Sequence, residues 1–361
     1  MKQVILVINP GSTSTKVALF NQETLLVDQT IRHKAEELSQ FARIMDQKAF
    51  RRQLIMNVLE ENNYTIEDLR AVVGRGGLLK PIPGGTYIVD EAMLDDLIHE
   101  RYNTHASNLG AIIAHDIAEL AGVKAFIVDP VVVEEMAPIA KLSGLKGINR
   151  RSVSHALNQK AVARKSLEKD NKAYEESNVI VAHLGGGISI GAHSQGRMID
   201  VINGLDGEGP YSPERTGALP LFDFAKKIIE EKLQLEEVKK LLAGKGGIYS
   251  YINEIDLRQV LARIDKGDQE AKFYLDVMCY QIGKAIGEMA TVLKGQVELI
   301  ILTGGGAYSD YIVKEIKKAV EWIAPVETVP GEMEMEALNA GALRVLDGKE
   351  EARNYNETTI L

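Results

Sequence analysis

The chain has 361 residues, which at about 150 residues per domain predicts two domains. Hydrophobic residues make up 45% and charged residues 26%, a composition typical of soluble globular proteins that excludes disordered and collagen-like chains. The net charge of −9 disfavours binding to nucleic acid, because proteins that bind it are usually basic.

The compartment can also be predicted from composition. Cys279 is the only cysteine, which excludes an internal disulfide and a cysteine metal cluster and favours a reducing compartment. The apolar run 4–8 is too short for the core of a signal peptide, and no apolar stretch approaches the ~18 residues of a membrane span. We therefore expect a cytoplasmic protein with no membrane partner.

The first half of the chain predicts three consecutive strands, followed by strands that alternate with helices. β-Branched and apolar runs predict strands at 4–8, 16–20, 25–31, 71–73 and 125–128. Apolar residues at helical spacing predict a helix around 50–58, one that starts after Asp90 and runs through Arg101, and one over 106–120.

The second half repeats this order. Strands are predicted at 179–184, 188–192, 197–201, 299–303 and 326–329. Helices are predicted over 156–168, along a long stretch through Cys279 and Leu293, over 308–322 and near 336–346. The repeat predicts an α/β protein of two like domains that face a cleft, joined near Gly144–Arg151; two unrelated α/β domains are the alternative.

Three polar or glycine-rich turns directly follow predicted strands. They are Asn9–Thr15, with Lys16 beyond it, His183–Ser189 and Thr303–Ala307. Such turns let the backbone approach a ligand closely and direct N–H groups at phosphate oxygens. Gly304–Gly306 also precede a predicted helix, whose N-terminus favours an anion. Since the P-loop and the dinucleotide fingerprint are both absent, the turns predict a nucleoside triphosphate site of another kind.

Four further residues are candidates for catalysis. Arg75 lies between glycines, and Arg215 lies in the loop 209–217 with two prolines; either alone could be a solvated surface charge. Asp129 ends a buried strand, where it is either a catalytic carboxylate or a cap. His155, at the start of a predicted helix, is either catalytic, a local cap or a core histidine.

Two segments resemble the signatures of the acetate kinase family, within the superfamily of actin, hexokinase and the heat-shock chaperone ATPases: 9–16 (NPGSTSTK) and 182–189 (AHLGGGIS). Segments 73–77 (VGRGG) and 209–217 (GPYSPERTG) look like the butyrate kinase branch of that family. The resemblance covers almost the whole chain. It implies two duplicated ribonuclease H-like domains with a central cleft, the actin-like ATPase fold.

The resemblance implies domain ranges and residue roles. The N-terminal actin-like domain would span 1–148 and the nucleotide-binding C-terminal one 149–336, with a C-terminal helix of about 337–361 packing back on the first. Arg75 would hold the substrate carboxylate or the moving phosphoryl group, Asp129 matches the catalytic aspartate, and His155 and Arg215 match the transition-state stabilisers. The residues that would bind the nucleotide are Asn9, Ser12, Ser14, Lys16, His183, Gly185, Gly186, Gly187, Asp256, Arg258, Gly304, Gly305 and Gly306.

The metal ligands that the resemblance implies are Asn9 and a late glutamate. That glutamate falls in 332–336 (EMEME), where we choose Glu336, with Glu334 as the alternative. Gly186 departs from the pattern, because the family often has asparagine there. A side-chain contact to phosphate is then lost or replaced by backbone.

The implied reaction is reversible transfer of the ATP γ-phosphoryl group, with Mg²⁺, to the carboxylate of butyrate or a related short or branched acid. An acid with a pKa near ~4 is ionised at neutral pH and needs no general base, so Asp129 is predicted to position groups or organise the metal. An acetate or propionate kinase is the alternative, and a nucleotide-dependent switch protein a distant one. The family suggests a homodimer or a higher homo-oligomer.

Overall fold

The computed structural model describes residues 3–205 and 207–358 and divides into two compact units. Unit 1 comprises Met1–Glu134 and Met333–Leu361, and unit 2 comprises Glu135–Glu332. The domain ranges given above, with boundaries at 148/149 and 336/337, stay a prediction. Their residues 1, 2, 206 and 359–361 lie outside the described residues.

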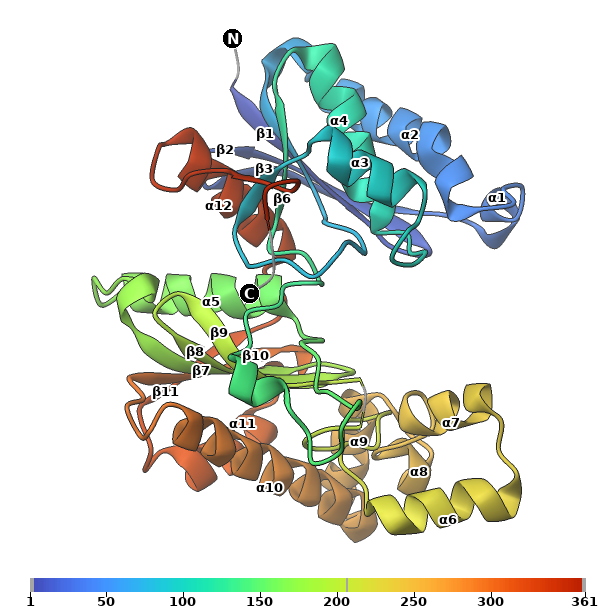
Figure 1. The fold of residues 1–361 in the computed structure, drawn as a ribbon, viewed down its shortest axis with the longest axis vertical. Coiled ribbons are helices and arrows are strands. Elements are labelled where there is room, and N and C mark those ends of the chain that lie inside the picture. The colour runs from blue at the N-terminus through green and yellow to red at the C-terminus, as the bar shows by residue number, and fades with distance from the viewer. Residues whose placement is uncertain (1–2, 206, 359–361) are drawn as a thin grey trace. The chain divides into compact units, whose positions relative to one another are not determined.

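Each unit contains three consecutive strands followed by helices and further strands (Figure 1). The strands are β1 (Val4–Pro10), β2 (Ser14–Asn21), β3 (Thr24–Arg32), β4 (Leu69–Gly74), β5 (Thr86–Ile88), β6 (Lys124–Val128), β7 (Asn178–Leu184), β8 (Ile188–Ser194), β9 (Arg197–Ile202), β10 (Leu299–Gly304), β11 (Val326–Pro330) and β12 (Arg353–Asn354). The α-helices are α1 (Ala35–Leu38), α2 (Lys48–Glu61), α3 (Glu91–Ile98), α4 (Asn108–Ala121), α5 (Ala156–Glu168), α6 (Leu221–Glu231), α7 (Leu235–Leu242), α8 (Tyr249–Ile252), α9 (Leu257–Asp265), α10 (Gln269–Val292), α11 (Asp310–Val320) and α12 (Glu334–Leu346).

Unit 1 is built on a seven-stranded sheet of order β12-β5-β6-β4-β1-β2-β3. The first three strands form an antiparallel meander, and β1, β4 and β6 are parallel. Helix α4 covers one face and α12 the other, so the central strands are buried on both faces and are almost wholly apolar (Figure 1). Two glycines permit this packing: a Cβ at Gly74 would lie 2.2 Å from a carbonyl of α4, and one at Gly341 would lie 2.5 Å from Val128.

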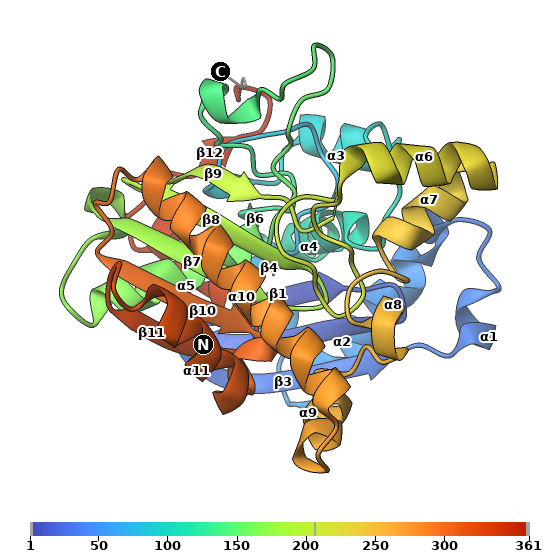
Figure 2. The same ribbon diagram turned by 90° about the horizontal axis from the view of Figure 1, so that it is seen from below.

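Unit 2 repeats the arrangement with a five-stranded sheet of order β11-β10-β7-β8-β9. Its strands match β6-β4-β1-β2-β3 in position and direction. Helix α5 packs on one face, and α10 and α11 cross the other (Figure 2). The predicted α/β fold of two duplicated units is therefore confirmed. No helix among the described residues is both long and apolar enough to cross a membrane.

The structure corrects three local predictions. The helix after Asp90 ends at Ile98 rather than Arg101. The helix predicted over 308–322 is α11, which spans only Asp310–Val320, and a 3₁₀ turn (Gly305–Tyr308) lies between it and the end of β10. Its N-terminus is capped by Ser309, whose hydroxyl accepts from the Ile312 N–H. Strands β5 and β12 were not predicted, since they have only three and two residues.

Candidate active site

The turn between β1 and β2 is held from inside unit 1 by Arg51 of α2. This fully buried guanidinium donates to the carbonyls of Gly11 (2.8 Å) and Ser14 (3.1 Å) and to Thr15 Oγ1 (3.0 Å). Gln47 Oε1 accepts from its Nε and Nη2. Burial among neutral oxygens lowers the pKa of Arg51 to about 10. The turn that the sequence assigned to phosphate binding is thus shaped by a cation that sequence reasoning missed.

The predicted nucleotide-binding residues of this hairpin lie around that turn. Asn9 and Lys16 are cross-strand partners in the β1–β2 register. Ser12 and Lys16 are exposed, and Ser14 is half-buried. Thr15, by contrast, is buried and hydrogen-bonded to His33 Nε2 (2.9 Å), so it belongs to the support of the turn.

Glu334, the first residue of α12, joins two predicted site residues of unit 1. Its Oε2 accepts from Asn9 Nδ2 (2.7 Å), and its Oε1 lies 3.5 Å from Arg75 Nη1. Arg75 Nη1 is buried and has no hydrogen-bond partner, since 3.5 Å is an ion-pair contact only. Glu336 is exposed and lies two residues farther along the helix, on another side of it. The structure therefore favours Glu334 over Glu336 beside Asn9.

Asp129 follows β6 directly and is buried. Its φ of +37° lies in the left-handed region, which is uncommon for a residue with a side chain. Its Oδ1 accepts from the Gly85 N–H (2.8 Å), and its own N–H donates to the Gly85 carbonyl (3.0 Å). These two bonds hold the carboxylate in a fixed place at the end of the strand.

Two histidines stack in unit 2. The rings of His155 and His183 lie 3.8 Å apart with an angle of 11° between their planes. His155 Nδ1 contacts Ser189 Oγ (2.9 Å), so its side chain does not cap α5. His183 is fully buried at the end of β7, with Nδ1 on Asn158 Oδ1 (2.8 Å) and Nε2 3.5 Å from Glu332. Sequence reasoning missed Ser189 and Asn158 as partners of these rings.

Arg215 packs against the glycine turn between β7 and β8. A Cβ on Gly187 would lie 2.0 Å from Arg215 Nη1, so only glycine leaves room for the guanidinium. Arg215 also donates to the carbonyl of Gly204, while its Nε is buried without a partner. Ser212 of the same loop donates to the carbonyl of Gly186. Burial lowers the pKa of Arg215, against an opposing effect of Glu214.

The remaining predicted residues divide into two groups. Gly304 has a φ of +85° and exchanges two backbone hydrogen bonds with Gly331, and a Cβ on Gly306 would lie 3.0 Å from Leu184. Gly305 is exposed, with open space around it. Asp256 and Arg258 pair with each other at an exposed helix start, where Asp256 accepts from the Arg258 N–H (2.9 Å).

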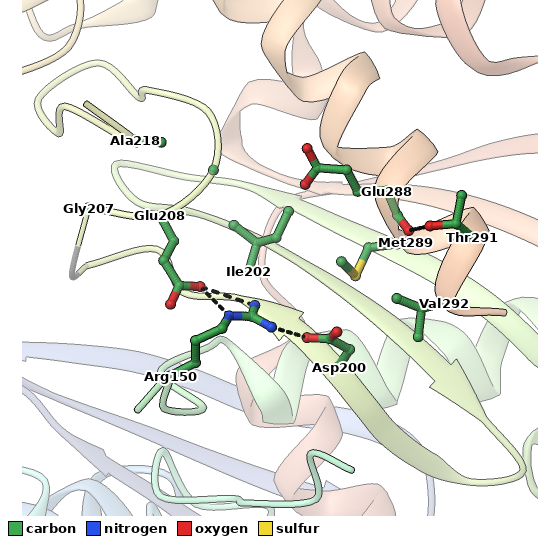
Figure 3. A pocket seen from close by; sticks show the side chains of 11 residues that line it. Arg150, Asp200, Ile202, Gly207, Glu208, Ala218, Glu288, Met289, Thr291 and Val292 are labelled. Carbon is green, nitrogen blue, oxygen red and sulfur yellow. Dashed lines mark hydrogen bonds and ion pairs between the residues drawn. The ribbon is translucent and has the colours of Figure 1, made fainter. Parts of the chain in front are cut away.

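A pocket of about 480 Å³ in unit 2 is separate from these residues (Figure 3). Its one guanidinium, Arg150, pairs with Asp200 (2.9 Å) and Glu208 (3.1 Å). Two carboxylates around one cation leave no positive charge to attract an anion. None of the predicted site residues lines this pocket.

The described residues contain no group of three or more His, Cys, Asp or Glu side chains that could hold a metal ion. Magnesium in nucleotide-dependent enzymes often needs only one or two protein oxygens together with substrate phosphates. The carboxylate of Glu334 and the amide oxygen of Asn9 are donors of that kind.

Comparisons with known proteins show the family and the fold of the chain. Residues 138–328 match the model of the acetokinase family. The chain is 61% identical over 358 residues to a probable butyrate kinase from Enterococcus faecalis, covering 99% of both chains. Its fold is similar to acetate kinase from Porphyromonas gingivalis (TM-score 0.77, 19% identity, 95% of this chain and 100% of the other). It is also similar to a propionate kinase from Francisella tularensis (TM-score 0.73, 18% identity, 94% and 99%).

The duplicated sheets and the similar solved structures show the actin-like ATPase fold that the sequence predicted. The family match and the full-length relative define the chain as a phosphotransferase. The chain belongs to the acetokinase family. Membership of this family of kinases implies the use of ATP or ADP.

Proposed function

We propose that the chain transfers the γ-phosphoryl group of ATP to the carboxylate of butyrate or a related short or branched acid, giving an acyl phosphate and ADP, and that it catalyses the reverse reaction. The observation that carries the proposal is the 61% identity, over 99% of both chains, to a probable butyrate kinase. The signatures around Asn9 and His183 and the two half-buried arginines support it.

The chemistry needs charge neutralisation rather than a base. A carboxylate substrate is ionised at neutral pH, so no proton has to leave it. The barrier comes from bringing an anion against a triphosphate, and catalysis comes from alignment and electrostatic stabilisation. Arg75 and Arg215 suit that task because a planar guanidinium binds two oxygens at once. Each keeps one buried N–H group without a hydrogen-bond partner.

The three turns carry groups that are suited to binding a nucleotide. Gly186 and Gly305 are exposed, so a phosphate or a ribose can approach their N–H groups closely. Lys16, Ser12 and Ser14 surround the first turn with a cation and hydroxyls. Asp129 is held too firmly by Gly85 to be a mobile group, which fits a positioning role.

Mg²⁺ is the metal that we propose. Asn9 and Glu334 would hold it, because hard cations prefer oxygen ligands. When bound, it neutralises phosphate charge. The pair of Glu334 with Arg75 at 3.5 Å is loose enough for a substrate anion to take over the guanidinium.

A hydroxylamine trap for acyl phosphate tests the reaction. The purified chain, ATP and Mg²⁺ are incubated with acetate, propionate, butyrate or isobutyrate, and kcat/KM is compared. We expect butyrate or isobutyrate to exceed acetate, with each methylene worth about 1 kcal/mol, or roughly fivefold. A preference for acetate or propionate would favour the first alternative, a kinase for smaller acids.

The second alternative is a nucleotide-dependent switch protein. ATP hydrolysis that does not respond to any added acid would favour it and contradict the proposal. We further propose a cytoplasmic location. We also propose a homodimer or higher homo-oligomer, and light scattering of the purified chain measures this oligomeric state.

A further inference from the structure

A chain of buried polar side chains leads from His155 into the interior of unit 2. The contacts are His155 Nδ1 to Ser189 Oγ (2.9 Å), Ser189 Oγ to Gln159 Nε2 (2.9 Å), Gln159 Oε1 to His193 Nε2 (3.0 Å) and His193 Nδ1 to Tyr174 OH (2.7 Å). Ser189, Gln159 and His193 have no exposed surface. We call these five residues the His155 relay.

A backbone carbonyl fixes the direction of the relay, meaning which group donates and which accepts in each hydrogen bond. Gln159 Nε2 also lies 3.3 Å from the carbonyl oxygen of Ser189, which can only accept a hydrogen bond. The amide nitrogen must therefore face Ser189, and the amide oxygen must face His193. A flipped amide would set two acceptors against each other in a buried site.

The far end of the relay agrees with this direction. Because Gln159 Oε1 accepts, His193 Nε2 carries a proton and Nδ1 accepts from the Tyr174 hydroxyl. Burial, helped by the charge of Lys160 and opposed by Glu135, lowers the pKa of His193 to about 3. The ring is then neutral, with the one donor and one acceptor that the relay needs.

The Ser189 hydroxyl determines whether His155 Nδ1 donates or accepts in the contact between them. A hydroxyl has one proton and two acceptor positions. Gln159 Nε2 donates to Ser189 Oγ at 2.9 Å, and the His155 backbone N–H faces the same oxygen at 3.5 Å. The hydroxyl proton is left for His155 Nδ1, 2.9 Å away.

We propose that the relay fixes neutral His155 as the tautomer protonated on Nε2, which makes the ring a hydrogen-bond donor rather than a base. Stacking on His183 keeps the ring plane fixed. The tautomer follows from unit 2 alone. Its use, donation to a phosphoryl oxygen during transfer, rests on the proposed function. Ser189 and Gln159 are then positioning residues.

Nitrogen-15 NMR of histidine-labelled protein reads the tautomer directly. Long-range proton–nitrogen correlations are recorded at about pH 8.5, above the ordinary histidine pKa, and a His155→Gln spectrum assigns the signals. We expect the wild-type protein to hold the proton of His155 on Nε2, with none detectable on Nδ1. A proton on Nδ1 would overturn the inference, whatever the activity of the enzyme.

Ser189→Ala tests the link to catalysis, with Ser194→Ala as the matched control on the same strand. The Ser194 hydroxyl donates to Asn178 Oδ1 (2.7 Å) and is not one of the five residues of the relay. We expect Ser189→Ala to make the Nδ1-protonated form of His155 visible and to lower kcat about tenfold, less than the roughly 10²-fold loss of a whole transition-state donor. KM for ATP should stay within about twofold, because the donor acts on the transition state.

The possible outcomes distinguish the inferred tautomer of His155 from its proposed role in phosphoryl transfer. An unchanged tautomer in Ser189→Ala would remove Ser189 from the relay and contradict the inference. A wild-type tautomer on Nε2 together with normal kcat in Ser189→Ala supports the relay but removes the proposed role of His155 in phosphoryl transfer. A variant that fails to fold leaves the wild-type spectrum as the deciding measurement.

Discussion

The β1–β2 turn of unit 1 and the β7–β8 turn of unit 2 occupy corresponding positions in sheets of the same strand order. In unit 1 a buried cation, Arg51, supports the turn by donating to the carbonyls of Gly11 and Ser14. In unit 2 a cation, Arg215, packs directly on a glycine of the turn and keeps a buried N–H group without a partner. The same hairpin is thus supported by a buried arginine in unit 1, whereas in unit 2 it contacts the arginine for which we propose a role in phosphoryl transfer.

Removing Arg215 should have the largest effect. We expect Arg215→Ala to lower kcat by about 10³-fold or more, in line with the loss of an arginine that stabilises phosphoryl transfer. The measurement is kcat in the acyl phosphate assay, with the melting temperature as a check on folding. Less than a fivefold loss in a folded variant would take Arg215 out of the catalytic set.

Asp129 tests whether unit 1 contributes chemistry as well as support. Asp129→Asn keeps an oxygen for the Gly85 N–H, and asparagine tolerates the positive φ, so the fold should survive. We expect kcat to fall by about 10²-fold or more, because a charge that organises the transition state is lost. Wild-type turnover in the folded variant would contradict a catalytic role for this carboxylate.

Two neighbouring glycines sharpen the role of the second turn. Gly187→Ala would place a methyl group on the guanidinium of Arg215, whereas the nearest atom to a Cβ on Gly186 is Glu214 Oε1 at 3.6 Å. We expect Gly187→Ala to lower kcat about 10²-fold through displacement of Arg215. Gly186→Ala is the control for displacement of Arg215: it should raise KM for ATP, because a phosphate is proposed to approach Gly186, and leave kcat within a few-fold of wild type. Equal rates in the two variants would mean that the position of Arg215 does not matter.

The two turns also show what sequence can predict. The apolar runs that alternate with helices gave both sheets, since strands buried on both faces leave a clear pattern. Asn9, His183 and Arg215 were predicted as site residues because each lies in or beside a glycine-rich turn, and their roles stay predictions. Arg51 and the contact of Ser189 with His155 were missed, because these residues lie inside a helix and a strand, where only burial distinguishes them from ordinary polar residues. The choice between Glu334 and Glu336 needed the helix to be placed on Asn9.

Arg51 should affect stability more than chemistry. Arg51→Met leaves the carbonyls of Gly11 and Ser14 and the amide of Gln47 without their donor, so we expect the free energy of unfolding to fall by about 3 kcal/mol. KM for ATP should rise, because the turn loses its shape. The control is Arg52→Met on the same helix, whose half-exposed pair with Asp116 is worth at most about 1 kcal/mol. Equal losses of unfolding free energy in the two variants, measured by urea denaturation, would show that Arg51 stabilises the protein no more than Arg52 does.

The smallest effect concerns pH, because His193 is neutral in the folded unit and free to charge when unfolded. Its pKa is about 3 in the structure, chiefly through burial, against about 6.5 in an unfolded chain. At a pH between these two values, His193 takes up one proton when the chain unfolds. The contribution of His193 to the free energy of unfolding is therefore complete above about pH 6.5 and is lost as pH falls towards about 3. The free energy of unfolding should therefore drop by about 1.4 kcal/mol per pH unit from this residue.

Urea denaturation between about pH 6.5 and 5, where most carboxylates stay ionised, should show that extra slope in the wild-type protein and not in His193→Gln. The same slope in both proteins would show that His193 already carries a proton when folded, and Tyr174 could then not donate to His193 Nδ1.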